Sequence, residues 1–299
     1  MEPRALGLRG LRLSLKVTVV NVMRKPPSSP PVIISMTTIP SRMHRIYPVL
    51  ESLTRQTALI DSVKLWIPKT YRRSGLAEFD LPQVPKGVEI CRADYDYGPA
   101  TKVFPCVLEN IAQAPDLSIL YCDDDRIYDP GWAQRLLDAG RLHPDCCIAE
   151  AGNFAHLVLA SEFKTKLPFK LLRFLTLNAS KLVFNGILRA RYQTGLRQSG
   201  GVIDICKGFG GVLVRPRFFR EEAFDIVEPF WAVDDVWISG MLAANGVSIR
   251  LLDQGLTSSG TELMGVDPLT QFSLDNRGRK QLDAECVRFF QRNYSIWMS

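Results

Sequence analysis

The chain has 299 residues, of which 46% are hydrophobic and 23% are charged, and its net charge is +6. These values fit an ordinary globular protein with one large domain or two moderate ones. The seven cysteines include no Cys-X-X-Cys pair, and the three histidines are not spaced for a zinc site. The composition thus argues against a disulfide framework and a structural zinc site, and we expect reduced thiols in a cytoplasmic protein.

The first 31 residues form a basic extension that ends in a proline- and serine-rich linker, residues 26–31. The apolar run within this extension is too short to span a bilayer or to serve as a signal sequence. No later stretch is long and apolar enough for a transmembrane helix. The domain proper is therefore expected at residues 32–299.

Apolar runs alternate with helical patterns over the first 150 residues. Continuous apolar runs, typical of buried parallel strands, predict strands at 32–36, 62–67, 88–92 and 117–121. Helical spacing predicts helices at 46–56, 100–112 and 132–142. This alternation predicts an α/β fold with a doubly wound, mostly parallel sheet flanked by helices and joined by right-handed crossovers.

The fourth predicted strand ends on three consecutive carboxylates, Asp123, Asp124 and Asp125. Three adjacent like charges repel one another, and a divalent cation is the simplest reason for their clustering, since hard cations prefer carboxylate oxygens. The carboxyl edge of a parallel strand is also where open α/β sheets bind ligands. An ordinary acidic turn is the structural alternative, and the triplet alone does not decide between the two.

A basic segment follows the predicted parallel strands. Residues 163–203 contain no Asp or Glu, and the basic residues between 164 and 197 are interleaved with aliphatic and aromatic ones. Such a segment is suited to an anionic membrane surface, and it equally fits two ordinary helices with a solvated basic face. The interleaving matches no nucleic-acid-binding motif, so we expect no nucleic-acid partner.

Beyond the basic segment, strands are predicted at 203–207 and 212–214, as a pair interrupted by the glycine-rich loop 208–211. Glycines there permit positive φ and a close approach of the backbone to a ligand. A structural bulge explains these glycines almost as well.

A helix is predicted to start at Asp234 and Asp235. Helix capping and the helix dipole alone favour acidic residues at such a position. The aromatic neighbours Trp231 and Trp237 favour a pocket instead. Sugars stack on aromatic faces, and an apolar surround raises the pKa of a carboxylate toward that of a working base.

The familiar phosphate-binding and hydrolase motifs are missing. The sequence contains no Walker A loop, no Gly-X-Gly-X-X-Gly after the first strand and no Gly-X-Ser-X-Gly elbow. If the first half binds a nucleotide, another group must neutralise its phosphates, and a metal held by aspartates is the obvious substitute.

Five elements in sequence order resemble GT-A glycosyltransferases of the family-two-like kind. They are Thr-Thr-Ile-Pro-Ser-Arg after the first strand, Asp-Tyr-Gly-Pro-Ala-Thr-Lys, the Asp triplet, Gly-Phe-Gly-Gly and Asp-Asp-Val-Trp, within residues 32–250. The resemblance implies a GT-A fold and metal-dependent, inverting transfer of a sugar from a nucleotide sugar, a UDP-sugar, to a glycan or lipid-linked acceptor. It further implies a donor half at 32–150, an insertion at 160–200 and an acceptor half at 201–299.

The resemblance also assigns roles to residues. Asp235 would be the catalytic base, with Asp234 positioning the acceptor. The donor nucleotide would contact Thr37, Thr38, Pro40, Arg42, Lys102, Asp123 and Asp124. Asp125 and Asp123 would hold Mn²⁺ or Mg²⁺. The sugar and acceptor would contact Gly210, Gly211, Trp231 and Trp237.

One departure from the family is that no histidine follows His156, so the downstream histidine that binds the metal in many GT-A enzymes is missing. Two other functions stay open. A metal-dependent nucleotidyl- or phosphotransferase would use the same acidic strand end without needing the Asp234–Asp235 pair. A catalytically silent carbohydrate-binding protein would keep the fold alone. The implied location is cytoplasmic, with a peripheral membrane position through residues 164–197 as the alternative.

Overall fold

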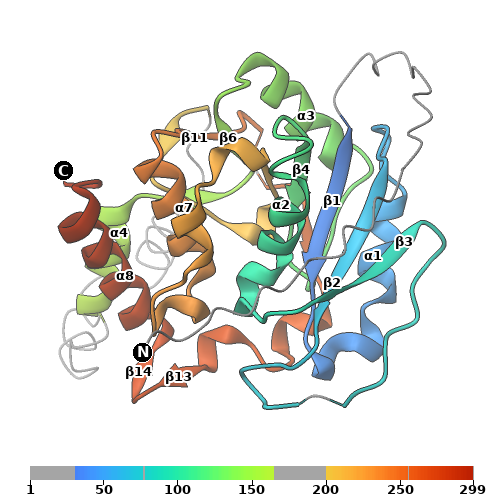
Figure 1. The fold of residues 1–299 in the computed structure, drawn as a ribbon, viewed down its shortest axis with the longest axis horizontal. Coiled ribbons are helices and arrows are strands. Elements are labelled where there is room, and N and C mark those ends of the chain that lie inside the picture. The colour runs from blue at the N-terminus through green and yellow to red at the C-terminus, as the bar shows by residue number, and fades with distance from the viewer. Residues whose placement is uncertain (1–30, 77, 165–199, 255, 299) are drawn as a thin grey trace, which may run out of the picture.

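The computed structural model describes residues 31–76, 78–164, 200–254 and 256–298. The predicted N-terminal extension, up to residue 30, and the basic segment, from residue 165, lie outside the described residues. The centre of the molecule is an eight-stranded sheet with the order β3-β2-β1-β4-β10-β6-β11-β8. Figure 1 shows β1, β2 and β3 at one side of the molecule and α4 and α8 at the other.

Four parallel strands form one part of the sheet: β1 (Val32–Thr37), β2 (Ser62–Pro68), β3 (Val88–Ala93) and β4 (Ser118–Tyr121). The remaining part contains β6 (Cys147–Ala149), β8 (Val202–Ile203), β10 (Val212–Val214) and β11 (Ile249–Leu251). β6 and β11 are parallel, whereas β10 runs antiparallel to both β4 and β6, and β8 is an antiparallel edge strand. The predicted α/β fold with a mostly parallel sheet is confirmed.

Three small two-stranded ladders lie outside the main sheet. They are β5 (Arg126–Ile127) with β12 (Ser259–Gly260), β7 (Gly152–Asn153) with β9 (Ile205–Cys206), and β13 (Ser273–Leu274) with β14 (Arg277–Gly278). The predicted pairing of 203–207 with 212–214 is therefore wrong. β8 pairs with β11, β9 pairs with β7, and β10 inserts between β4 and β6. Gly211, at φ 93°, lies at the turn from the glycine loop into β10.

Helices cover both faces of the sheet. α1 (Tyr47–Thr54) and α3 (Trp132–Leu142) pack on one face, with Ile34 and Met36 of β1. α2 (Phe104–Asn110), α7 (Asp234–Ala244) and α8 (Arg279–Tyr294) pack on the other, with Ile33. α4 (Ala155–Lys164) contacts α8. Because both faces of β1 are covered, its sequence is a continuous apolar run.

Short 3₁₀ helices connect many of these elements. They are η1 (Pro40–Arg45), η2 (Gly98–Lys102), η3 (Gly208–Gly210), η4 (Pro216–Phe218), η5 (Glu221–Phe224), η6 (Phe230–Ala232), η7 (Glu262–Gly265) and η8 (Leu269–Gln271). The helix predicted at 100–112 is in fact η2 followed by α2. Pro105 explains the break, because proline fits the first turn of a helix but not its interior.

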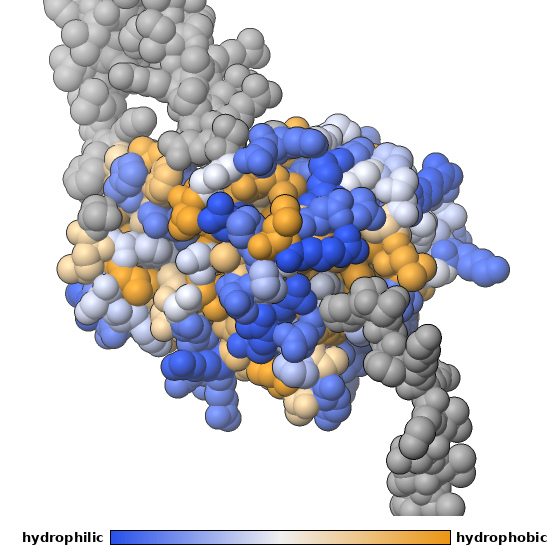
Figure 2. Space-filling view, turned by 90° about the horizontal axis from the view of Figure 1, so that it is seen from above, coloured by the Kyte–Doolittle hydropathy of each residue, from blue (hydrophilic) through white to orange (hydrophobic). Residues whose placement is uncertain are grey.

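All seven cysteines are free thiols. Within the described ranges, no helix is long and apolar enough to cross a membrane. The face seen from above in Figure 2 mixes hydrophilic and hydrophobic residues, with hydrophilic ones prominent near its centre.

Candidate functional site

The predicted donor residues lie where the order of the sheet reverses. β2 and β3 lie on one side of β1, and β4 lies on the other. In open α/β sheets, ligands bind at such a switch point, beyond the carboxyl ends of the strands. The loop after β1 carries Thr38, and the loop after β4 carries Asp123 to Asp125, so the topology brings these two loops together.

Asp124 fastens the loop after β4 to the loop after β1. Its carboxylate accepts a 2.6 Å hydrogen bond from Thr38 Oγ1 and a short one from Arg42 Nη1. Arg42 Nε in turn donates to Val266 O at 2.9 Å, and Tyr71 donates to Thr38 O at 2.8 Å. The side chains of Thr38, Arg42 and Asp124 are all buried. Their contacts hold the two loops together, and their polar atoms are already engaged with one another.

Lys102 joins the Asp triplet to the Asp234–Asp235 pair. Its Nζ lies 2.6 Å from Asp123 Oδ1 and 2.7 Å from Asp234 Oδ2. Asp234 Oδ2 meets no donor in hydrogen-bond geometry among the described residues, so this second contact is an ion pair. The backbone of Lys102 is tied to β1, because Ser35 Oγ donates to Lys102 O at 2.7 Å. The ammonium itself is buried, with 4% of the side chain exposed.

Asp234 and Asp235 have different surroundings although they are adjacent at the start of α7. Asp234 is ion-paired through both oxygens, since Arg279 Nη2 donates to Oδ1 at 3.2 Å. Asp235 Oδ1 accepts a 3.0 Å hydrogen bond from Gly208 N, and its Oδ2 lies 3.3 Å from Lys207 Nζ. The Asp234 side chain is 3% exposed and that of Asp235 is 12% exposed. Asp235 is therefore the more accessible of the two acids.

The charges in this centre shift one another's proton affinities. Burial opposes the charge of Lys102, but Asp123 and Asp234 outweigh it and hold the pKa of Lys102 well above its ordinary value. Burial also opposes ionisation of Asp234, but Lys102 and Arg279 lower the pKa of Asp234 to about 2. Burial raises the pKa of Asp123 to about 6, although Lys102 acts in the opposite direction. Because 32% of the Asp123 side chain is exposed, water tempers this rise.

In the part of the chain that the structure describes, the carboxylate of Asp125 makes the weakest contacts in the triplet, although its main-chain carbonyl accepts hydrogen bonds from Thr261. Its Oδ2 lies 3.7 Å from Arg42 Nη1, and burial together with Asp124 raises its pKa. Among the described residues, no group of three or more His, Cys, Asp or Glu side chains is placed to hold a metal ion. A divalent cation bound at the triplet would therefore have few protein carboxylates, with Asp125 and Asp123 as the candidates, and other ligands would supply its remaining oxygens.

The glycine loop packs against two different neighbours. A Cβ on Gly208 would lie 2.3 Å from Lys102 Nζ, so the ammonium occupies the space that a side chain would fill. A Cβ on Gly211 would lie 2.3 Å from the indole of Trp132, whose Nε1 donates to Gly210 O at 2.8 Å. Gly208 thus borders the acidic centre. Gly211 and the carbonyl of Gly210 contact the core tryptophan, whereas a Cβ on Gly210 would meet Ala151 at 2.9 Å.

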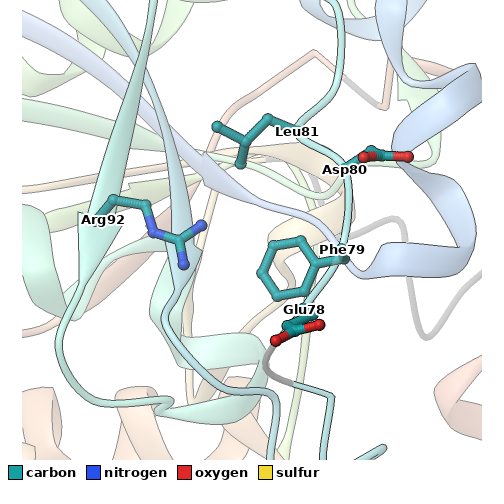
Figure 3. A pocket seen from close by; sticks show the side chains of 5 residues that line it. All are labelled: Glu78, Phe79, Asp80, Leu81 and Arg92. Carbon is teal, nitrogen blue, oxygen red and sulfur yellow. The ribbon is translucent and has the colours of Figure 1, made fainter.

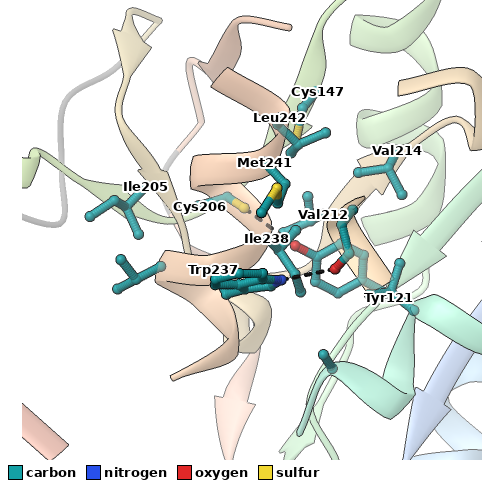
Figure 4. Packing of buried hydrophobic residues seen from close by; sticks show 14 of the residues in the cluster. Tyr121, Cys147, Ile205, Cys206, Val212, Val214, Trp237, Ile238, Met241 and Leu242 are labelled. Atoms are coloured by element: carbon teal, nitrogen blue, oxygen red, sulfur yellow. Dashed lines mark hydrogen bonds between the residues drawn. The ribbon is translucent and has the colours of Figure 1, made fainter. Parts of the chain in front are cut away.

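The two predicted aromatic contacts differ in position. Trp237 is 1% exposed, its Nε1 donates to Ala223 O at 2.9 Å, and it lies within the packed cluster of Figure 4. This burial leaves no ring face open to a ligand, so Trp237 packs as a core residue. Trp231 packs against Gly98, and the guanidinium of Arg72 lies 5.0 Å from its ring. Trp231 is buried, whereas the ring of Tyr95, whose centroid is 5.9 Å from the same guanidinium, is exposed.

Two further predicted residues, Thr37 and Pro40, lie at the end of β1 and in the loop after it. Thr37 Oγ1 donates to Trp66 O at 2.8 Å, which ties the end of β1 to β2. Pro40 begins η1, where its fixed φ suits the first position of a helix.

A surface pocket of about 510 Å³ lies apart from the acidic centre. Glu78, Phe79, Asp80, Leu81 and Arg92 line it, as Figure 3 shows. The Arg92 guanidinium lies 5.4 Å from the Phe79 ring centroid, and Phe79 packs edge-on against Tyr71. None of the residues predicted for the site lines this pocket.

Sequence reasoning missed three charged residues of the acidic centre. Lys207 lies beside Asp235, Arg279 pairs with Asp234, and Asp283 lies 3.8 Å from Arg279 Nε. Lys207 directly precedes the glycine loop, which is a signal that was available in the sequence. Arg279 and Asp283 lie beyond the matched motifs, and only the packing of α8 against α7 brings them to the site.

Comparisons with known proteins give limited likenesses. No model of a known protein family matches the chain, and no curated protein is significantly similar to it. The crystal structure of S. aureus TarS 1–349 in complex with UDP matches 88% of this chain and 73% of that chain, at 13% identity and a TM-score of 0.39. A second crystal structure of S. aureus TarS 1–349 matches 88% of this chain and 72% of that chain, at 12% identity and a TM-score of 0.37. These values are too low to bear on function.

Proposed function

We propose that this protein is a glycosyltransferase of the GT-A type, which moves a sugar from a nucleotide sugar to a hydroxyl of a glycan or lipid-linked acceptor. The donor is a UDP-sugar, and the reaction inverts the anomeric centre. The observation that carries the proposal is the meeting of two acidic sites from distant parts of the chain through one buried cation. Lys102 contacts Asp123 at 2.6 Å and Asp234 at 2.7 Å. A phosphotransferase would need only the first of these acids.

The two acidic sites suit the two halves of a transfer reaction. Asp123 is the most exposed carboxylate of the acidic centre. It lies at the switch point of the sheet, where a nucleotide donor is expected. Asp235 has the freer carboxylate of the second site, because Asp234 is held by two cations. We therefore assign the proton-accepting role to Asp235 and an anchoring role to Asp234.

The reaction then follows from these positions. Asp235 takes the proton of the acceptor hydroxyl as its oxygen attacks the anomeric carbon. The bond from that carbon to the diphosphate oxygen breaks on the opposite face, and the nucleoside diphosphate leaves with the electron pair. The Lys102 ammonium stabilises negative charge on the departing diphosphate from its place beside Asp123. A single displacement of this kind inverts the stereochemistry.

A divalent cation is part of the proposal. When bound, Mn²⁺ or Mg²⁺ would supply Lewis-acid stabilisation of the diphosphate, with Asp125 and Asp123 as its protein ligands. The proposal is supported by the carboxylate of Asp125, whose ionic contact among the described residues is with Arg42 at 3.7 Å.

A thermal-shift screen of nucleotide sugars, with and without Mn²⁺ or Mg²⁺, identifies the donor. A ligand that binds the folded state raises the unfolding temperature by mass action, so we expect a shift from one UDP-sugar when metal is present. Release of UDP on addition of an acceptor would then support glycosyl transfer. Release of pyrophosphate instead would favour a nucleotidyltransferase, and sugar binding without any turnover would favour a silent carbohydrate-binding protein.

Asp235→Asn tests the assignment of the base. The amide keeps the size of the carboxylate and accepts the Gly208 N–H, but it takes no proton. We expect transfer to fall by roughly 100-fold to 10,000-fold, the usual contribution of a general base, while donor binding by calorimetry is unchanged. Transfer at the normal rate would remove Asp235 from this role.

The basic segment at residues 164–197 adds a partner to the proposal. Its sequence alternates basic with aliphatic and aromatic residues, which suits adsorption to an anionic membrane surface. We expect the protein to bind vesicles of anionic lipid and to be released by salt, since salt screens the attraction. Equal binding to neutral vesicles, or none to either, would refute this partner.

A further inference from the structure

We propose that Arg279, the first residue of α8, is a positioning residue for transfer, which acts through Asp234 to hold the Lys102 ammonium beside Asp123. This inference rests on the proposed function and adds a residue that lies outside every matched motif. Arg279 is 45 residues from Asp234 in sequence, and its Nη2 donates to Asp234 Oδ1 at 3.2 Å.

The first step of the argument concerns Asp234. Both of its oxygens face cations from other elements, Lys102 from η2 and Arg279 from α8. The side chain is 3% exposed, so water does not compete for it. A buried carboxylate held in this way is an anchor between two cations and has no free oxygen to accept a proton from a substrate.

The second step concerns the freedom of Lys102. A lysine side chain has a flexible stem and a compact charge, so its position depends on its partners. Here the ammonium lies between Asp123 and Asp234 and against the bare backbone of Gly208. If Asp234 lost Arg279, Lys102 would be its remaining ion-pair partner within the described residues. The ammonium would then be drawn toward Asp234 and away from Asp123, where the donor binds.

The third step is the charge of the whole cluster. Three cations, Lys102, Lys207 and Arg279, face four carboxylates. The carboxylates are Asp123 at the end of β4, Asp234 and Asp235 on α7, and Asp283 on α8. One carboxylate is therefore in excess, and the loss of Arg279 would leave two. Asp234 would then bind a proton more easily, because one of the two cations that hold it ionised would be gone.

Arg279→Gln tests the inference, because glutamine keeps most of the length and removes the charge. We expect kcat to fall by about 100-fold, the effect of a small misplacement at a reacting centre, with a smaller change in the KM for the UDP-sugar. The rate falls more than KM rises because the displaced ammonium is needed most as charge develops on the diphosphate. The acid limb of the pH–rate profile should move to higher pH.

Two further variants separate positioning from a general structural effect. Arg279→Lys keeps the charge, so it should restore the acid limb and part of the rate. If Arg279→Gln folds poorly, a partial loss of kcat in Arg279→Lys with an unchanged acid limb tests the inference instead. Arg277→Gln is the matched control, because Arg277 lies two residues away and pairs with Asp275 and Glu285. It should leave kcat and the acid limb unchanged.

The inference is overturned if Arg279→Gln behaves like Arg277→Gln. It is also overturned if Arg279→Gln and Arg279→Lys lose rate equally without any shift of the acid limb, as a structural defect would. If the wild-type protein transfers no sugar, the proposed function fails, and acid unfolding still tests the Arg279–Asp234 contact. Arg279→Gln should then unfold at higher pH than Arg277→Gln, and identical acid unfolding would refute the contact.

Discussion

At the scale of single residues, the glycine loop shows how one segment serves two purposes. Gly208 leaves room for the Lys102 ammonium, and Gly211 leaves room for the Trp132 indole. The first neighbour is the end of a flexible side chain, whereas the second is a rigid, fully buried ring. The same substitution at these two positions should therefore have different consequences.

Gly211→Ala should destabilise the fold, because its Cβ would meet the indole and alanine disfavours φ 93°. We expect a loss of about 1–3 kcal/mol in the free energy of unfolding, measured by chemical denaturation. Gly208→Ala should displace the ammonium from Asp123 and so lower transfer, with a smaller loss of stability. The reverse pattern, with Gly208 essential for stability and Gly211 for transfer only, would contradict these contacts.

At the scale of elements, the close packing of α7 on α8 sets the geometry of the acidic centre. A Cβ on Gly240 of α7 would lie 2.3 Å from the Phe290 ring of α8. α7 carries Asp234 and Asp235, and α8 carries Arg279, so the distance between these helices determines the contact between their charged residues. The glycine is therefore part of what brings Arg279 to Asp234.

Gly240→Ala should separate the two helices. Alanine is a better helix former than glycine by about 1 kcal/mol, so an increase in stability would be expected if the site were open. Here the clash with a buried ring should outweigh that gain and lower the free energy of unfolding by about 1–3 kcal/mol. Gly265→Ala is a control, because no atom lies within 4 Å of its Cβ position. Stabilisation by Gly240→Ala would show that the helices are not in close contact.

Local sequence predicted the elements well where the signal was local. The helix at 132–142 has the predicted bounds, and Asp234 begins α7 as expected. Pro105 indicated a helix boundary, which the prediction of one helix at 100–112 overlooked. The partners of β10 could not be predicted from the sequence, because its antiparallel insertion between β4 and β6 depends on strands far away in sequence. The two acidic motifs could be found because each consists of adjacent residues. Arg279 was missed because its contact with Asp234 joins residues 45 positions apart.

At the scale of the whole molecule, one sheet unites both predicted halves of the domain. β10 from the second half lies between β4 and β6 of the first half, so the acidic motifs on either side are fixed relative to each other. Lys102 then neutralises carboxylates of both. Such a cluster costs stability, because its carboxylates outnumber its cations and most of them are buried.

The stability of the molecule should therefore respond in opposite directions to two conservative substitutions. The pKa of Asp123 is about 6 in the folded state, above its ordinary value of 3.8, so the folded state binds the proton first as pH falls. Ionised Asp123 thus lowers stability at neutral pH, and this penalty shrinks as pH falls from about 6 to 3.8 and is absent below that value. The pKa of Asp234 is about 2, so its ionisation adds stability above 3.8 that is lost as pH falls further.

Asp123→Asn should consequently raise the unfolding temperature at neutral pH, and Asp234→Asn should lower it. In mildly acidic solution the gain from Asp123→Asn should shrink, because the wild-type carboxyl is then protonated as well. Breaking a buried ion pair from one side typically costs about 3–5 kcal/mol, so the loss in Asp234→Asn should be the larger effect. Differential scanning calorimetry of both variants at the two pH values measures these shifts. Destabilisation by Asp123→Asn at neutral pH would mean that its ion pair with Lys102 outweighs its burial.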